Sequence, residues 1–160
     1  MPDVHDPATR SRNMAAIRGT DTKPELFVRR ALHALGLRFR LHVGGLPGRP
    51  DIVLPRHRAV VFVHGCFFHG HGCDLFKWPS SNEEFWREKI GRNVERDGLS
   101  MQRLRADGWR VATVWECALK GRAKLDGQAA MQSLAQWVRE GEDTIVIRGG
   151  GDWSHHLNNL

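Results

Sequence analysis

The 160-residue sequence contains few cysteines, no long hydrophobic run and no internal repeat. No apolar segment approaches the ~20 residues that a membrane-spanning helix requires, which excludes a membrane protein. The N-terminal segment MPDVHDPATRSR has no apolar core, so we expect no export signal. The three cysteines form an odd count, which argues against a disulfide framework. We therefore expect a reduced, cytoplasmic protein whose thiols are free to bind a metal.

Basic residues outnumber acidic ones, and most of them are arginine. The chain has 24 Lys and Arg residues against 18 Asp and Glu, a net charge of +6, and 19 of the basic residues are Arg. The excess lies in residues 1–49, which hold nine basic and four acidic residues. Because the guanidinium fork matches phosphate oxygens, this distribution favours a nucleic-acid partner. Arginine-favouring codon usage and a well-solvated surface are an equally good explanation of the charge alone.

Capping residues and hydrophobic periodicity predict one mixed domain. The predicted helices cover residues 7–18, 22–36, 82–106 and 124–140. The predicted strands cover residues 37–43, 51–54, 59–64, 109–115 and 144–147, the second and third forming a hairpin and the last an edge strand. Gly91 and Gly98 weaken the helical pattern of residues 82–106. The order of elements predicts an α/β (α+β) fold with a mixed central sheet flanked by helices.

Cysteine and histidine gather in one short segment. Cys66, His71 and Cys73 fall within eight residues, and Cys117 follows the strand predicted over residues 109–115. Three thiolates and one imidazole suit tetrahedral zinc, and no cysteine is left over. Four protein ligands indicate a structural zinc site that joins the irregular loop 65–80 to the end of a core strand. The alternative is three unrelated buried cysteines.

A second group of polar residues surrounds the predicted hairpin. Asp51 begins its first strand and His64 ends its second. This layout is typical of magnesium nucleases, because Mg²⁺ prefers oxygen ligands and takes only a few from the protein. His69 follows in the loop and Asp97 lies on the long helix, and a His–Asp pair near a phosphate can hold or transfer protons. Read alone, Asp51 is more often a turn residue.

Several long blocks of the sequence match one known family. They are DVHDPATRSRNMAAIR, LPGRPDIV, VFVHGCFFHGHGC, FWREKIGRNVERD and GWRVATVWECALKGR. Over nearly all of residues 3–140, the chain resembles the very-short-patch repair (Vsr) DNA mismatch endonucleases. The resemblance implies a restriction-endonuclease-like fold, related to the PD-(D/E)xK nucleases. It also implies magnesium-dependent nicking on the 5′ side of the thymine in a T:G mismatch that arises when 5-methylcytosine deaminates.

The resemblance assigns roles to particular residues. The implied catalytic residues are Asp51, His64, His69, Asp97 and Glu25. Asp51 and the main-chain carbonyl of Val63 are the implied magnesium ligands, and Glu25 is expected to reach metal-bound water. The structural zinc ligands of the family coincide with Cys66, His71, Cys73 and Cys117. The E-x-K motif of the wider superfamily is absent, and the tripeptide 62–64 stands in its place, as the family leads us to expect.

Aromatic and basic residues complete the implied DNA interface. Phe67, Phe68 and Trp86 match a wedge that enters the duplex beside the mismatch, although core packing is the alternative for each ring. Phe68 stands where we expect Trp, and a phenyl ring offers less stacking area and no indole donor. The candidate phosphate contacts are Arg10, Arg12, Arg18 and Arg49.

The predicted organisation is one nuclease domain over residues 1–147. Residues 1–20 form a DNA-contacting helix, loop 65–80 carries the zinc site and the wedge, and residues 148–160 form a flexible tail. The expected partners are double-stranded DNA with a T:G mismatch, mismatch-repair factors and a functionally linked cytosine methyltransferase. We expect a monomer in the cytoplasm of a bacterial cell, associated with the nucleoid. Two alternatives stay open, namely a related nuclease with another target and a zinc-stabilised DNA-binding protein without catalysis.

Overall fold

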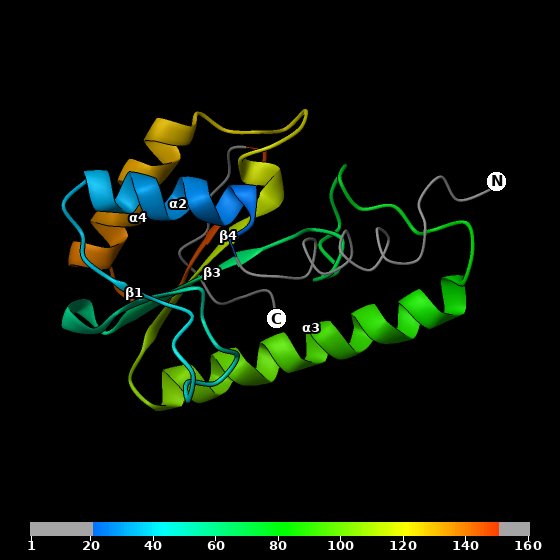
Figure 1. Ribbon diagram of the computed structural model, residues 1–160, viewed down its shortest axis with the longest axis horizontal. Coiled ribbons are helices and arrows are strands. Elements are labelled where there is room, and N and C mark those ends of the chain that lie inside the picture. The colour runs from blue at the N-terminus through cyan, green and yellow to red at the C-terminus, as the bar shows by residue number, and fades with distance from the viewer. Residues whose placement is uncertain (1–20, 151–160) are drawn as a thin grey trace.

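The computed structural model describes residues 21–150. A five-stranded mixed sheet in the order β1-β2-β3-β4-β5 forms its centre. Helices α2 and α4 lie together over one face of this sheet, and the long helix α3 runs beneath the other (Figure 1). The helix predicted over residues 7–18 lies outside the described residues, as do Arg10, Arg12, Arg18 and residues 151–160 of the predicted tail.

Three α-helices, two short 3-10 turns and five strands make up the regular secondary structure of the described residues. The helices are α2 (Lys23–Ala34), α3 (Glu83–Ala106) and α4 (Gly127–Glu140), with short 3-10 turns η1 (Pro55–His57) and η2 (Glu116–Ala118). The strands are β1 (Arg40–Leu41), β2 (Ile52–Leu54), β3 (Ala59–His64), β4 (Arg110–Trp115) and β5 (Ile145–Ile147). Within the described residues, no helix is both long and apolar enough to cross a lipid bilayer.

The sheet changes direction at β3. Strands β1, β2 and β3 pair antiparallel, whereas β3, β4 and β5 pair parallel. The parallel register sets His64 beside Trp115, so the carboxyl ends of β3 and β4 meet at one edge. Loop 65–80 and η2 both leave the sheet from this edge. Chemistry-bearing residues that follow the two strands are therefore brought together by the topology.

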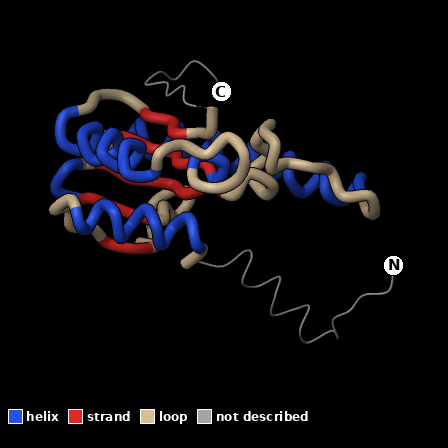
Figure 2. The backbone as a smooth tube through the Cα atoms, turned by 90° about the horizontal axis from the view of Figure 1, so that it is seen from above, coloured by secondary structure: helices blue, strands red, loops and turns tan. Residues whose placement is uncertain are grey.

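Side chains on the two faces of the sheet form two hydrophobic clusters. Alternate residues of β3 point in opposite directions, so Val61 packs with α2 and α4 while Val60 packs with α3. The larger cluster includes fully buried residues from both helices, such as Leu32 and Leu134. The smaller one holds Leu104 near the end of α3 and leaves much of this helix outside the core. The amino-terminal part of α3 and loop 65–80 extend beyond the sheet (Figure 2).

Most predicted elements are confirmed, with differences at their ends. The hairpin, the parallel edge strand and an unbroken α3 all form. Gly91 and Gly98 are tolerated in α3, where a side chain at either position would meet nothing within 4 Å. The predicted strand 37–43 is wrong over most of its length, because only Arg40–Leu41 pairs and His42 adopts a left-handed φ of 48° that ends the ladder. Helix α4 begins at Gly127, where Asp126 caps the backbone N–H groups of residues 128 and 129.

Candidate active site

A cleft of about 730 Å³ lies at the carboxyl edge of β3, facing α3. Its lining includes most of the residues predicted for catalysis and DNA contact, namely Arg49, Asp51, Val63, His64, Phe67, Phe68, His69 and Asp97. Glu25 is buried just behind the wall of the cleft, at 2 % exposure, and Trp86 packs against the rings of the wedge. The fold thus gathers residues from α2, the segment before β2, β3, loop 65–80 and α3 around one cleft.

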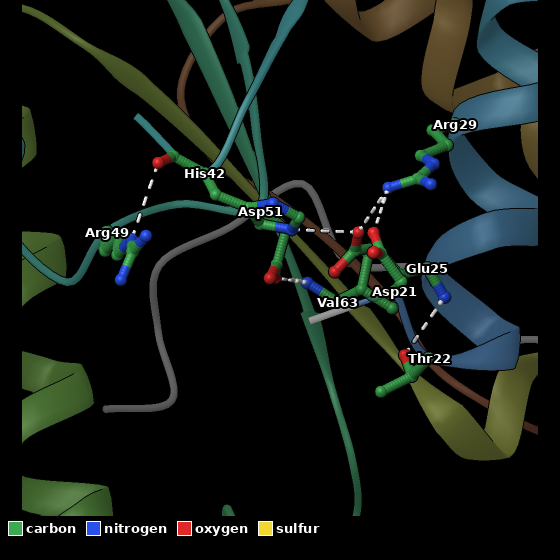
Figure 3. A network of polar contacts seen from close by, with 8 residues as sticks. All are labelled: Asp21, Thr22, Glu25, Arg29, His42, Arg49, Asp51 and Val63. Carbon is green, nitrogen blue, oxygen red and sulfur yellow. Dashed lines mark hydrogen bonds and ion pairs between the residues drawn. The ribbon is translucent and has the colours of Figure 1, made fainter. Parts of the chain in front are cut away.

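Asp51 stands at the wall of the cleft, directly before β2. One carboxylate oxygen, Oδ2, accepts a hydrogen bond of 2.7 Å from the backbone N–H of Val63 on β3 (Figure 3). Burial raises the pKa of Asp51 to about 6, and the nearby Glu25 carboxylate adds to this rise while the Val63 N–H opposes it. The raised pKa means that the ionised form of Asp51 is destabilised when no cation is bound. A cation bound to this carboxylate would stabilise the ionised form and lower the pKa again.

Glu25 is held by donors from two directions. Its Oε2 atom lies 2.9 Å from Arg29 Nη1, one turn along α2, and 2.9 Å from His42 Nε2 beyond β1 (Figure 3). Arg29 also contacts Asp21 at 2.6 Å, so one guanidinium joins two carboxylates. Burying a carboxylate without partners is costly, and these two donors offset that cost. Thr22 caps the helix by accepting from the Glu25 N–H, which fixes the start of α2 at the cleft.

Two imidazoles stack in the cleft at the end of β3. The rings of His64 and His69 lie 3.7 Å apart and within 4° of parallel. Burial, and then the neighbouring His69, lowers the pKa of His64 well below its usual value, so His64 is neutral near pH 7. His69 Nδ1 lies 2.6 Å from Asp97 Oδ2 on α3. That bond orients the ring, and Nε2 of His69 has no hydrogen-bond partner among residues 21–150, so it could exchange a proton with a bound molecule.

The predicted zinc ligands form a compact cluster. The thiol sulfurs of Cys66, Cys73 and Cys117 and a ring nitrogen of His71 all lie within 4.8 Å of one another. His71 Nδ1 is 3.5 Å from both Cys66 Sγ and Cys117 Sγ. Three thiols and one imidazole at this spacing fit a tetrahedral, thiolate-preferring metal ion. The cluster could hold such an ion, which would tie loop 65–80 to η2.

Packing around the cluster supports a structural role. His71 stacks on Trp115 at 4.2 Å, and the Gly149 N–H donates to Cys117 Sγ at 3.3 Å. Burial raises the pKa of both Cys66 and Cys117, so both thiols are protonated in the metal-free chain at neutral pH. Binding of a metal would release those protons.

The three wedge residues form one aromatic group. The Phe67 ring contacts Phe68 at 5.0 Å and Trp86 at 5.3 Å in edge-to-face geometries. Gly70 lets the loop approach α3, because a Cβ at this position would lie 2.8 Å from Val94 and its φ of 66° is left-handed. Phe67 and Phe68 line the cleft, whereas Trp86 supports them from α3.

Several residues at the cleft were not identified from the sequence. Lys89, Asn93 and Arg96 of α3 line it beside Asp97, and Asn93 also donates to the Phe68 carbonyl at 3.0 Å. Asn93 and Lys89 lie four and eight residues before Asp97, which places all three on the same face of the helix. This spacing could have identified Asn93 and Lys89 from the sequence, once Asp97 was taken as a candidate. His42 gave no such signal, because its role depends on a left-handed backbone turn after β1.

The arrangement defines a class of protein. A mixed sheet in which a hairpin meets a parallel strand, with a carboxylate and a His–Asp pair in the cleft beside it, is restriction-endonuclease-like.

Comparisons with known proteins identify the family. The family model described as DNA mismatch endonuclease Vsr matches residues 2–75. The DNA mismatch endonuclease Vsr of Escherichia coli is 53 % identical over 138 residues, covering 86 % of this chain and 88 % of that protein. The type II nicking enzyme V.XorIIP of Xanthomonas oryzae is 47 % identical over 80 % of this chain and 94 % of its own length. The nicking enzyme V.NmeAIP of Neisseria meningitidis is 41 % identical over 91 % of this chain and all of its own length. The chain therefore belongs to the Vsr family of DNA mismatch endonucleases.

Proposed function

We propose that this protein is a DNA mismatch endonuclease that nicks duplex DNA 5′ to the thymine of a T:G mismatch arising from 5-methylcytosine deamination, in very short patch repair. The observation that carries the proposal is the single cleft that joins Asp51, the His69–Asp97 pair and the aromatic wedge. Membership of the Vsr family supports the reaction class, and the names of the relatives include both mismatch endonucleases and nicking enzymes.

Asp51 and the main-chain carbonyl of Val63 would hold a magnesium ion in this reaction. The donor set fits, because both atoms are hard oxygens and Asp51 is a half-buried carboxylate that lacks a cationic side chain in contact with it among residues 21–150. When bound, magnesium supplies Lewis-acid stabilisation of the charge on the phosphate. His69, oriented by Asp97, would exchange a proton through its free Nε2 atom. Glu25 would orient a water molecule beside Asp51.

Neutral His64 packs beneath His69 and would hold it in place. Its ring lies parallel to that of His69 and edge-on to Trp115 at 5.3 Å. The His69 ring therefore packs against the His64 ring, which in turn packs against Trp115. Because burial keeps His64 uncharged, two adjacent imidazolium charges are avoided when His69 takes up a proton. In this proposal, His69 exchanges the proton and His64 holds the His69 ring in position.

The wedge and the basic residues would supply recognition. Phe67 and Phe68 would replace stacking that is lost when the mismatched step opens, which is worth about 1–3 kcal/mol per base. Arg49, Lys89 and Arg96 border the cleft and would contact phosphates, together with Arg10, Arg12 and Arg18 outside the described residues. Structural zinc at Cys66, His71, Cys73 and Cys117 would fix the loop that carries the wedge.

The wider setting is part of the same proposal. We place the protein in the bacterial cytoplasm, associated with the nucleoid, as a monomer that acts with mismatch-repair factors. A cytosine methyltransferase is the functional partner expected of this reaction, because its product generates the T:G mismatch when it deaminates.

One assay tests the proposed reaction against its alternatives. A duplex with one T:G mismatch, its T:A counterpart and an unmethylated C:G control are incubated with the protein and Mg²⁺, and the 5′ ends of the products are mapped. The proposal expects one nick, 5′ to the mismatched thymine, and loss of nicking in Asp51→Asn. Equal cleavage of T:A DNA would favour a nuclease with another target. Binding without cleavage would favour a catalytically inactive DNA-binding protein.

A further inference from the structure

The Glu25 carboxylate stands in a network that the proposed reaction does not by itself explain. Glu25 is buried at 2 % exposure, and its Oε2 atom accepts from both Arg29 and His42 at 2.9 Å. The two donors offset the cost of burying the carboxylate, and they also fix its position from two directions. Glu25 also lies within hydrogen-bonding reach of the Asp51 side chain, and it raises the pKa of Asp51.

His42 is connected to three parts of the cleft at once. Its side chain contacts Glu25, its backbone N–H donates to the Asp51 carbonyl at 3.1 Å, and its own carbonyl accepts from Arg49 Nε at 3.4 Å. The residue adopts a left-handed φ of 48°, which costs free energy for a non-glycine residue. Strained backbone conformations of this kind persist where the surrounding contacts fix them, and often lie at functional sites.

We infer that His42 is a positioning residue for the proposed reaction: through its Nε2 atom, together with the Arg29 guanidinium, it fixes the Glu25 carboxylate beside Asp51, where Glu25 would orient a water molecule of the magnesium site. This inference rests on the proposed function. His42 acts through Glu25 and touches no substrate. Arg29 restrains the carboxylate from α2, and His42 restrains it from the β1 side (Figure 3).

Outer partners of this kind tune a metal site without binding the ion. Hydrogen bonds to a carboxylate fix its rotamer and spread its charge, and loss of such partners usually costs about 10–100-fold in metal affinity or activity. The network also explains why Arg29 contacts Asp21, because that pair holds the guanidinium at the helix start. The group Asp21, Glu25 and His42 has metal-ligand spacing, but Arg29 already supplies the cation between the two carboxylates.

Two substitutions of His42 separate its hydrogen bond from its backbone conformation. In His42→Gln, the side-chain Nε2 reaches about as far as the imidazole Nε2 and can still donate to Glu25. In His42→Asn, the shorter side chain places its donor where Nδ1 was, although Asn tolerates a left-handed φ best among non-glycine residues. His33→Asn is the matched control, because His33 is exposed on α2 away from the cleft.

Each variant is compared with wild type by nicking of the T:G duplex over a Mg²⁺ series. Mn²⁺ binding to the protein with T:A duplex is followed in parallel by the electron paramagnetic resonance signal of the free ion. His42→Asn is expected to raise the Mg²⁺ midpoint and weaken Mn²⁺ binding about tenfold or more, whereas His42→Gln recovers most of the loss. In a Glu25→Gln background, His42→Asn should add little, because both changes disable the same carboxylate.

The outcomes distinguish the inference from the function on which it rests. If wild type does not nick T:G DNA, the proposed function is wrong. If wild type nicks but His42→Asn keeps the wild-type Mg²⁺ and Mn²⁺ midpoints, or its effect multiplies with that of Glu25→Gln, only the inference is overturned. Should His42→Asn fail to fold, Arg29→Met tests the same network from α2. It removes the other donor to Glu25, and an unchanged midpoint there also overturns the inference.

Discussion

Asp51 combines burial with a nearby carboxylate, and both features work against its ionised form. A pKa near 6, against an ordinary value of 3.8, means that the folded protein binds more protons than the unfolded chain between these two pH values. The free energy of unfolding therefore falls as pH rises through that window. Above about pH 6 the ionised carboxylate remains a destabilising feature of the metal-free protein.

Asp51→Asn is expected to raise the stability of the metal-free protein at pH 7.5, by an amount on the order of 2 kcal/mol, and to change it little below pH 4. The amide can still accept from the Val63 N–H, but it carries no charge to desolvate. Urea unfolding of both proteins at pH 3.5, 5, 6 and 7.5, without added Mg²⁺, measures the difference. A variant that is less stable than wild type at pH 7.5 would contradict the burial argument.

His69→Ala is expected to slow nicking about 10²–10⁴-fold while DNA binding is retained, because a positioned proton-transfer group contributes an effect of that size. Asp97→Asn should reproduce part of the loss, since it keeps the contact to Nδ1 but removes the negative charge. Single-turnover nicking rates and binding constants for T:G duplex give the comparison. A His69→Ala variant with wild-type rates would assign proton transfer to another group.

At the scale of elements, loop 65–80 depends on contacts beyond its own backbone. Gly70 packs against α3, Asn93 holds the Phe68 carbonyl, and the metal-type cluster reaches η2 through Cys117. The loop has few residues that are fully buried, so its order must come largely from these attachments. Disruption of one attachment should therefore affect the loop more than the sheet.

Cys66→Ser is expected to remove the bound zinc and lower the melting temperature, since structural zinc contributes directly to folding. Chelation of zinc from the wild-type protein should reproduce the effect. Elemental analysis, thermal unfolding and hydrogen exchange of residues 65–80 report the three consequences. Well-folded wild-type protein that contains no zinc would show that the cluster serves another purpose.

Phe67→Ala is expected to reduce the preference for T:G over T:A DNA. An intact pair resists opening and a mismatch does not, so loss of the ring removes the interaction that only the mismatch permits at low cost. Nicking and binding of both duplexes are measured, with Phe27→Ala as control, because Phe27 is an exposed ring on α2 that does not line the cleft. Unchanged discrimination would place the wedge elsewhere.

At the scale of the whole molecule, the excess of basic residues and the residues of the cleft lie mostly in different parts of the chain. Residues 1–49 hold the net positive charge, whereas residues 50–100, which supply most of the cleft, are balanced at seven basic and seven acidic residues. Backbone attraction and mismatch recognition should therefore respond differently to salt and to truncation.

Removal of residues 1–18 is expected to weaken binding to T:G and T:A duplexes by similar factors and to flatten the dependence of the binding constant on salt. The removed segment carries three arginines, and for each arginine that no longer neutralises a phosphate, the slope of log K against log salt falls by about one. Binding over 50–300 mM KCl tests this. If truncation abolishes discrimination while Phe67→Ala does not, the N-terminal segment reads the mismatch.

Sequence alone predicted most helices and strands along the chain, the Cys–His cluster and the grouping of Asp51 with His69. Those predictions succeeded because strand patterning and short-range spacing are local properties. The positions of Glu25, Lys89 and His42 could not be predicted from local patterns, since they depend on how α2, α3 and the turn after β1 pack against β3. Strand 37–43 was predicted too long because alternation cannot reveal the left-handed residue that ends it.

The parallel pairing of β3 with β4 also constrains how the chain folds. Loop 65–80 and the whole of α3 lie between these strands, so a long stretch of chain must close before its pairing stabilises the fold. Such nonlocal closure is slow, and it is the step at which an open edge of β3 is exposed to other chains. The antiparallel hairpin of β2 and β3 is local and can form first. Cys66 and Cys73 lie at the start of that stretch, and Cys117 lies just past its end. Zinc bound to these residues early in folding would bring the ends of the stretch together. The time during which the edge of β3 is exposed to aggregation would then be shorter.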